Sequence, residues 1–137
     1  MFTFVTENIY LLYVMSILKK NIPVGLASDH AGFEMKQFIK QFLIEKGIEI
    51  KDFGTFSHPL ANAIESGECY PGFAFCGSGN GINMTLNKHQ KIRAALCWNE
   101  EIGKLARLHN DANICVMPGR FIKNEEAEKI AETFLNT

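Results

Sequence analysis

The chain has 137 residues, of which 47% are hydrophobic and 21% charged, and its formal net charge is −1. This length is enough for one domain with a single hydrophobic core, and the near-neutral charge gives no basic face for nucleic acid. The four cysteines show neither CxxC spacing nor a grouping with histidines, which argues against a disulfide framework and a zinc site and favours a reduced, cytoplasmic protein.

Residues 1–21 differ in composition from the rest, because the segment up to Met15 is rich in Phe, Tyr, Leu and Val and is followed by two lysines. These charges come after the apolar run, with no small-residue cleavage site, so a signal peptide is not predicted. The run is too short to span a bilayer. Two interpretations stay open, an added helix or a start upstream of a functional one at Met15. We expect an extension at 1–21 and one domain at 22–137.

Short apolar runs alternate with segments of helical periodicity along the rest of the chain. Continuous apolar runs are typical of strands buried on both faces, and spacings of three and four residues are typical of amphipathic helices. In chain order, the predicted elements are a strand at 23–27, a helix at 35–43 that ends at Gly47, a strand at 48–53, a helix at 58–66, a strand at 70–76, a helix at 79–87, a strand at 92–98, a helix at 99–108, a strand at 114–117 and a helix capped by Asn124.

This alternation predicts βαβ units, and therefore an α/β fold with a five-stranded parallel sheet covered by helices on both faces. In such a fold the ligand crevice lies beyond the carboxyl ends of the strands. Polar residues gather at those ends. They are Asp29 and His30 after the first strand, residues 76–81 after the third, Trp98 and Asn99 after the fourth, and Arg120 after the fifth.

Segment 73–81 is the most informative of these, because a buried strand ends at Cys76 and opens into a glycine-rich turn. Such a turn exposes backbone N–H groups at the positive end of a helix, where anions bind, and a cysteine there loses its proton more easily than a free thiol. Cysteine also packs as a small core hydrophobe, which is the alternative. The glycine spacing is neither the dinucleotide fingerprint nor a P-loop.

Several other candidates keep a structural alternative beside the functional one. Asp29 and His30 are either a helix cap and an exposed loop residue or an acid/base or phosphate-binding pair. His109 continues an apolar helix face, so a buried structural histidine is an equal alternative, and Asn110 suits a helix end. The remaining expectations are core positions for Cys97 and Cys115, and surface positions for His58, His89, Arg93 and Arg120.

Taken together, these stretches strongly resemble the type B ribose-5-phosphate isomerases, a group that includes galactose-6-phosphate isomerase subunits. Each stretch alone is weak evidence, but their shared order makes the match highly specific, and it covers the chain from Ile22 onward. The matching segments are 28–34, 52–55, 76–81, 87–88, 92–95 and 109–113.

The resemblance implies a Rossmann-like three-layer α/β/α sandwich that forms a homodimer or homotetramer with active sites shared between subunits. It also implies that neither a metal nor an organic cofactor is needed. The expected reaction interconverts ribose 5-phosphate and ribulose 5-phosphate through an enediolate. The alternatives are another sugar phosphate, such as galactose 6-phosphate or allose 6-phosphate, or an inactive member that binds a phosphorylated sugar.

By the same resemblance, Cys76 is the base that moves a proton between C1 and C2, and Ser78 and His109 help to open the sugar ring. Fixed N–H dipoles stabilise an enediolate without reorganising, which suits the turn that follows Cys76. We expect Asp29 with His30, and His109 with Asn110, to lie at strand ends that neighbour Cys76. The presence of these side chains favours Cys76 as a base that shuttles a proton over Cys76 as a covalent nucleophile.

The resemblance also assigns the binding residues. Asp29 contacts sugar hydroxyls, and His30 and Arg120 contribute to phosphate or substrate binding. His109, Asn110 and Arg120 are expected to reach the site from the partner subunit. The backbone groups expected to hold the enediolate oxygen belong to Gly77, Gly79, Asn80 and Gly81 and the residues between them.

The chain departs from the family pattern in three places. A stretch with an Asp-Tyr-Pro segment, whose tyrosine lines the substrate site, usually lies between the positions of Ser57 and His58, so we expect a pocket that lacks one wall. The bare connection is still long enough for a crossover. The family typically continues past Thr137 into an arginine-bearing tail, and without those arginines phosphate affinity should be lower. The extension at 1–21 is not a family feature.

Overall fold

Five parallel strands form one sheet in the computed structural model, which describes residues 17–137. The expectations for the segment up to Met15 lie outside the described residues. In order across the sheet the strands are β2 (Ile50–Asp52), β1 (Val24–Ser28), β3 (Gly72–Cys76), β5 (Ile114–Pro118) and β4 (Ala94–Leu96). The helices are α2 (Phe33–Glu45), α3 (Ser57–Ser66), α4 (Asn80–Leu86), α5 (Glu100–Asn110) and α6 (Asn124–Asn136).

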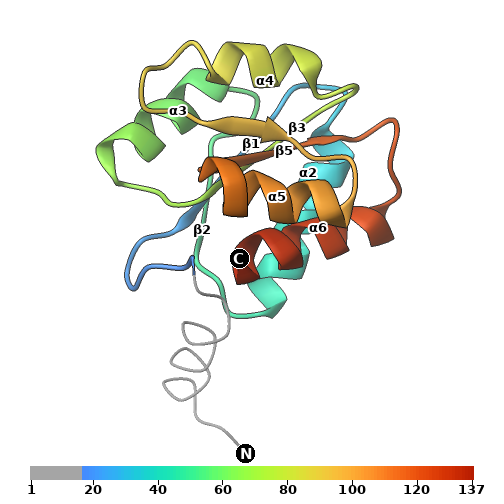
Figure 1. The fold of residues 1–137 in the computed structure, drawn as a ribbon, viewed down its shortest axis with the longest axis horizontal. Helices are drawn as coiled ribbons and strands as arrows, with labels where there is room; N and C mark the ends of the chain where they lie inside the picture. Colours follow the sequence, from blue (N-terminus) through green and yellow to red (C-terminus); the bar gives the residue numbers. More distant parts are fainter. Residues whose placement is uncertain (1–16) are drawn as a thin grey trace, which may run out of the picture.

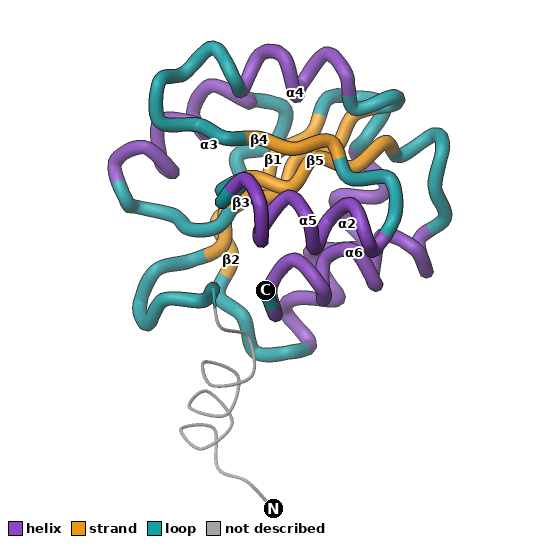
Figure 2. Tube along the Cα trace, in the orientation of Figure 1, coloured by secondary structure: helices purple, strands orange, loops and turns teal. Residues whose placement is uncertain are grey.

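Helices cover both faces of the sheet. Figure 1 shows α3 and α4 on one side and α2, α5 and α6 on the other, and the tube in Figure 2 shows the strands between these two layers. Helix α5 packs against α6, and α3 packs against α4. The predicted Rossmann-like α/β/α sandwich with a five-stranded parallel sheet is therefore confirmed.

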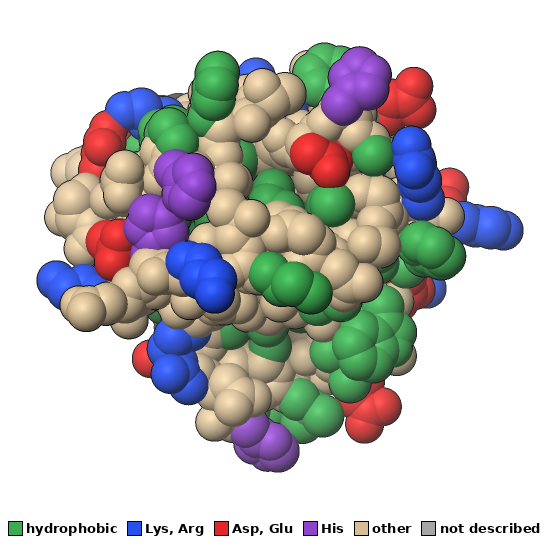
Figure 3. All heavy atoms as spheres, turned by 90° about the horizontal axis from the view of Figure 1, so that it is seen from above, with side chains coloured by type: hydrophobic (Ala, Val, Ile, Leu, Met, Phe, Trp, Pro, Cys, Tyr) green, Lys and Arg blue, Asp and Glu red, His purple; other side chains and the backbone are tan. Residues whose placement is uncertain are grey.

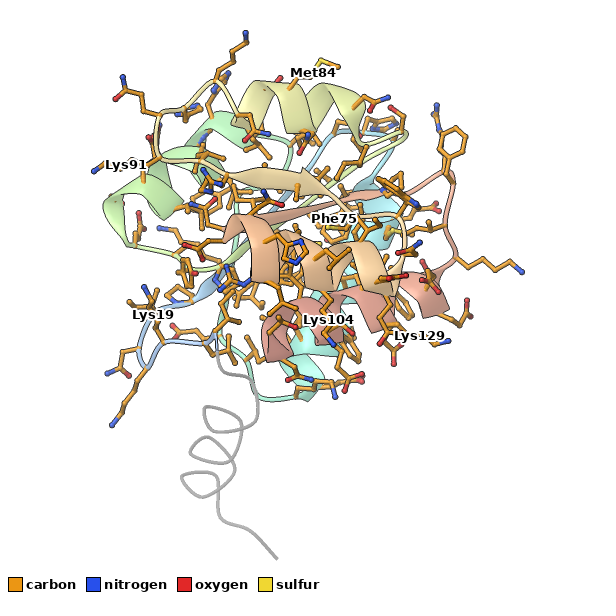
Figure 4. All side chains as sticks on the ribbon, viewed as in Figure 1. Lys19, Phe75, Met84, Lys91, Lys104 and Lys129 are labelled. Carbon is orange, nitrogen blue, oxygen red and sulfur yellow. The ribbon has the colours of Figure 1, made fainter. Side chains whose placement is uncertain are left out.

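The core divides into one cluster on each face of the sheet. Phe73, Phe75 and Phe134 belong to the cluster under α2, α5 and α6, whereas Leu60 and Val116 belong to the cluster under α3 and α4. The Phe73 and Phe134 rings meet edge to face with centroids 5.6 Å apart. Figure 4 shows Phe75 deep between the two layers. Each large apolar side chain buried in this way contributes about 1.5–3 kcal/mol to folding, so the strand that carries Cys76 is firmly held.

The two edge strands are shorter than predicted, with β2 at Ile50–Asp52 and β4 at Ala94–Leu96. An edge strand pairs on one side only, and the N–H of Ile48 bonds to Leu43 at the end of α2 instead of to the sheet. The prediction that Asn124 caps the last helix is wrong. Lys123 is the cap, because its carbonyl already accepts a hydrogen bond from the N–H of Ala127 at 3.0 Å.

The short connection between Asp52 and Ser57 still supports a crossover, since the chain returns through α3 and β3 pairs in parallel with β1. The described chain packs onto the core from its first residue, because Ile17 is buried and its N–H bonds to the carbonyl of Leu135. Among the described helices, none combines the length and the hydropathy that crossing a membrane requires.

Candidate active site

The site is centred on Cys76, the last residue of β3, and Asp29, which directly follows the neighbouring strand β1. Ser28 lies beside Phe75 in the register of these strands, so the next residues of both strands emerge side by side at the same edge of the sheet. The Cys76 thiol donates to Asp29 Oδ2 with an Sγ–Oδ2 distance of 2.9 Å. The other carboxylate oxygen of Asp29 accepts from the N–H of Gly32 at 2.9 Å. Asp29 is not the cap of α2, because Gly32 occupies that position, but its carboxylate holds the N–H of Gly32 and also faces the thiol.

Cys76 differs from the other three cysteines in this contact and in its exposure. All four are free thiols, and Cys69, Cys97 and Cys115 are completely buried, whereas Cys76 retains 9% of its surface. Burial raises the pKa of the Cys69 and Cys115 thiols, which keeps them protonated and suits structural roles. The core positions expected for Cys97 and Cys115 are confirmed.

The turn after Cys76 presents backbone donors. Ser78 is exposed, and its Oγ accepts from the N–H of Asn80 at 3.2 Å where α4 begins. Gly79 has a φ of +82°, and a Cβ there would lie 2.3 Å from Leu96 Cδ1, so the turn depends on glycine at this position. Among residues 17–137, no acceptor receives a hydrogen bond from the N–H of Ser78 or of Gly79. The N–H of exposed Ser78 is therefore available to an anion, and the space around exposed Gly81 is open, whereas Gly79 is buried.

Arg120 and the loop that carries His30 approach this turn from two other strands. The N–H of Arg120 donates to the carbonyl of Gly77 at 3.0 Å, which continues the pairing of β5 with β3. A Cβ on Gly77 would lie 3.2 Å from Arg120 Cδ and 3.3 Å from the Cβ of Ala31. His30 precedes Ala31 and is exposed. Arg120 therefore lies beside Gly77 of its own chain, whereas the resemblance implied a contribution from the partner subunit.

His109 and Asn110 lie away from this group. They end α5 immediately before β5 begins, and because β5 runs parallel to β3, the start of β5 and the end of β3 are at opposite edges of the sheet. The expectation that they lie at a strand end that neighbours Cys76 is thus wrong. His109 is exposed, so the alternative of a buried structural histidine is wrong too. The Asn110 carbonyl accepts from Arg93 Nε at 2.6 Å, which ties this turn to the segment before β4.

One polar cluster has no counterpart in the sequence-based expectations. His58 Nδ1 lies 2.8 Å from His89 Nε2, and His89 Nδ1 lies 3.0 Å from Glu65 Oε1. Figure 3 shows two histidine side chains in contact on the face covered by α3 and α4. Hydrogen bonds from the N–H of Lys91 and from His89 lower the pKa of Glu65. No local motif predicts this cluster, because the packing of α3 against the chain after α4 brings it together.

Gly32 is the point where α2 contacts the strand that carries Cys76. A Cβ at this residue would lie 2.3 Å from the carbonyl carbon of Phe75 and 2.6 Å from the backbone nitrogen of Cys76. Neither atom can rotate away, so Gly32→Ala must push α2 off β3. We expect this variant to lose at least about 2 kcal/mol of unfolding free energy, measured by urea denaturation followed by circular dichroism. Gly81→Ala is the matched control, because a Cβ on Gly81 has no atom within 4 Å and should change stability by less than about 1 kcal/mol. Equal stability of the two variants would contradict the close packing described here.

Known proteins share this fold and this sequence pattern. The family model described as Ribose/Galactose Isomerase matches residues 24–137. Ribose-5-phosphate isomerase B of Escherichia coli K12 is 34% identical over 122 residues, which is 82% of each chain. The crystal structure of a ribose 5-phosphate isomerase from Thermotoga maritima is 41% identical, with a TM-score of 0.83, and the match covers 85% of this chain and 88% of that one. A 4-deoxy-4-sulfo-D-erythrose isomerase from Clostridium sp. MSTE9 is 35% identical over 125 residues, 83% of this chain and 79% of its own.

The fold, together with these matches, defines an enzyme of the sugar-phosphate aldose–ketose isomerase class. Within that class, the chain belongs to the ribose/galactose isomerase family, as the sequence motifs indicated.

Proposed function

We propose that this enzyme interconverts ribose 5-phosphate and ribulose 5-phosphate through an enediolate, with Cys76 as the base. The observation that carries this proposal is the Cys76 thiol, 2.9 Å from the Asp29 carboxylate and next to a turn with free N–H groups. Moving a proton between C1 and C2 requires one group that accepts and returns it, and donors that stabilise the negative oxygen in between. Both requirements meet at the end of β3.

In the proposed reaction, deprotonated Cys76 removes the proton from C2 of the open-chain aldose. The electron pair of that C–H bond forms the double bond of the enediolate, whose negative oxygen binds the N–H groups of residues 77–81. Cys76 then returns the proton to C1, and the hydroxyl proton on the C2 oxygen moves to the negative C1 oxygen, so that the C2 oxygen becomes the ketose carbonyl. Fixed N–H dipoles cost little reorganisation, so they lower the barrier where the charge develops.

The remaining contacts of the substrate are also part of the proposal. Asp29 binds sugar hydroxyls, and His30 and Arg120 bind the phosphate from the two sides of the glycine turn. Ser78, at the start of α4, assists ring opening. His109, as the second ring-opening residue, and Asn110 act from the partner subunit of a dimer or tetramer, because both lie at the far edge of their own sheet. The catalytic domain of this proposal is residues 22–137, with 1–21 as an extension.

A second sugar substrate is favoured by one specific observation, the 35% identity with the 4-deoxy-4-sulfo-D-erythrose isomerase. Enzymes of this family thus act on more than one anionic sugar. Galactose 6-phosphate and allose 6-phosphate are the hexose alternatives, and binding of a phosphorylated sugar without turnover is the non-catalytic one.

A substrate panel tests the proposal. The full chain is assayed for isomerisation of ribose 5-phosphate, galactose 6-phosphate, allose 6-phosphate and 4-deoxy-4-sulfo-D-erythrose. We expect kcat/KM for ribose 5-phosphate to exceed the others by at least about tenfold, because each unmatched sugar hydroxyl leaves a polar group of the site unpaired. A preference for another sugar would contradict ribose 5-phosphate as the substrate but would leave the proposed aldose–ketose isomerisation unchanged. Measurable binding by calorimetry with no turnover of any sugar would contradict the catalytic proposal.

A further inference from the structure

Lys36 is a buried charge close to the active site. It lies one turn into α2 and is 1% exposed. Its Nζ donates to Asp52 Oδ1 at 2.8 Å, across the gap between α2 and the end of β2. Burying an ammonium group is costly unless it is paired and hydrogen-bonded, so this contact is maintained whenever the protein is folded. Lys40 reaches the other oxygen of Asp52 at 3.1 Å, but its side chain is 33% exposed.

The Asp52 carboxylate connects Lys36 to the loop after β1. Its Oδ1 also accepts from the N–H of Gly54 at 2.8 Å. The Gly54 carbonyl in turn accepts from the N–H of Ser28 at 3.0 Å. Ser28 is the last residue of β1 and directly precedes Asp29, so these contacts fix the beginning of the loop that carries Asp29.

The backbone of Lys36 fixes the other end of the same loop. Its N–H donates to the carbonyl of Gly32 at 3.0 Å, and the N–H of Gly32 donates to Asp29 Oδ1 at 2.9 Å. The loop between Ser28 and Gly32 is therefore held at both ends by contacts that meet at Lys36. The free oxygen of Asp29 is the one that accepts the Cys76 thiol.

The negative charge of Asp52 strengthens its hydrogen bonds to Lys36 and to the N–H of Gly54. Burial raises the pKa of its carboxyl, but hydrogen bonds from Lys36, the N–H of Gly54 and Lys40 together outweigh burial and hold that pKa below its usual value. Asp52 thus stays ionised at neutral pH. An ionised carboxylate makes stronger hydrogen bonds than a neutral one, so both Lys36 and the Gly54 backbone are firmly bound.

We propose that Lys36 is a positioning residue, which holds the Asp29 carboxylate against the Cys76 thiol through the Asp52 carboxylate and the loop between Ser28 and Gly32. Lys36 does not touch the reacting atoms. Its role in turnover rests on the proposed function, whereas its effect on the thiol can be measured without any substrate.

The experiment compares Lys36→Met with Lys40→Met in the full chain. Methionine fills a similar volume without the charge, and Lys40 binds the same carboxylate from a more exposed position. Three quantities are measured: kcat and KM with ribose 5-phosphate, the melting temperature, and the rate of Cys76 alkylation by iodoacetamide, located by peptide mass spectrometry. Buried Cys69, Cys97 and Cys115 report any loss of the native fold.

For Lys36→Met we expect kcat to fall at least about tenfold with KM changed less than about threefold, because misplacement of a catalytic group lowers turnover more than binding. Cys76 alkylation should rise at least about threefold, since the thiol is no longer held as a donor to a fixed carboxylate. For Lys40→Met, kcat and the Cys76 alkylation rate should both stay within about twofold of the wild type. Lys40 does not bind the Asp52 oxygen that accepts from the N–H of Gly54.

A folded Lys36→Met protein with wild-type kcat and alkylation rate would overturn the proposal, even if its melting temperature falls, since that is the signature of a purely structural role. If Lys36→Met does not fold, Asp52→Asn decides by the same two readings, because it keeps an oxygen for the Gly54 N–H while weakening the contact with Lys36. If the wild type turns over no ribose 5-phosphate, the proposed function fails, and the alkylation rates still test the positioning role.

Discussion

Replacing Cys76 with alanine is expected to lower kcat for isomerisation of ribose 5-phosphate by at least about a thousandfold, because the variant lacks the base that we propose carries the proton between C1 and C2. KM should change much less, since the Asp29 carboxylate and the glycine turn remain in place. A coupled assay of ribulose 5-phosphate formation measures both constants. Hydrogen–deuterium exchange at C2 of the bound sugar, followed by NMR, should stop with the same substitution.

Cys97→Ala is the matched control for this experiment. Cys97 is a free, buried cysteine just after β4, and its thiol donates to the carbonyl of Ala95 at 3.4 Å instead of facing the site. We expect this variant to keep its kcat within about twofold and to lose about 1 kcal/mol of stability, as a small cavity in the core does. Near-normal turnover by Cys76→Ala would contradict the assignment of Cys76 as the base.

The second large effect concerns His109. We expect His109→Ala and Cys76→Ala, each nearly inactive alone, to recover activity when their subunits are exchanged. His109 lies at the opposite edge of the sheet from Cys76, so a site that uses both must take one from each of two subunits. In a mixed dimer one site carries both substitutions and the other carries neither. Random exchange therefore restores about a quarter of the sites.

Subunit exchange is achieved by refolding the two variants together from urea, and the mixed species is isolated through two different affinity tags. The control is each variant refolded alone, which should stay inactive. A pure mixed dimer without activity would show that the two residues do not meet across subunits. Full activity of His109→Ala alone would remove His109 from the mechanism.

The central part of the site could be predicted from the sequence for a simple physical reason. Alternating strands and helices force parallel strands, and parallel strands gather their carboxyl ends at one edge. Asp29 and Arg120 each follow a strand and Cys76 ends one, so their convergence follows from the pattern alone. His109 precedes a strand, and the same rule puts it at the other edge.

Contacts between distant elements could not be predicted in this way. Lys36 and Asp52 carry no motif, and a lysine on an amphipathic helix is normally exposed; only the packing of α2 over β2 buries it. His58 and His89 are separated by 31 residues and meet because α3 and the chain after α4 share one face of the sheet. The edge strands are also shorter than their apolar runs, because hydrogen bonding on one side does not hold their ends.

The strand order separates the chemistry of this enzyme from its choice of substrate. The chain winds from β1 outward to β2 and then returns to β3, so Asp29 and Cys76 flank the point where the winding direction reverses. The position between Ser57 and His58, where relatives are expected to carry an additional stretch, lies at the start of α3, which follows the edge strand β2, and β2 is separated from β3 by β1. Insertions of different length and sequence at the start of α3 can therefore reshape the sugar pocket, while the thiol and carboxylate keep their geometry. In evolution, substrate specificity can therefore change through the segment that follows the edge strand β2, while the Cys76 and Asp29 pair at the centre of the sheet is retained.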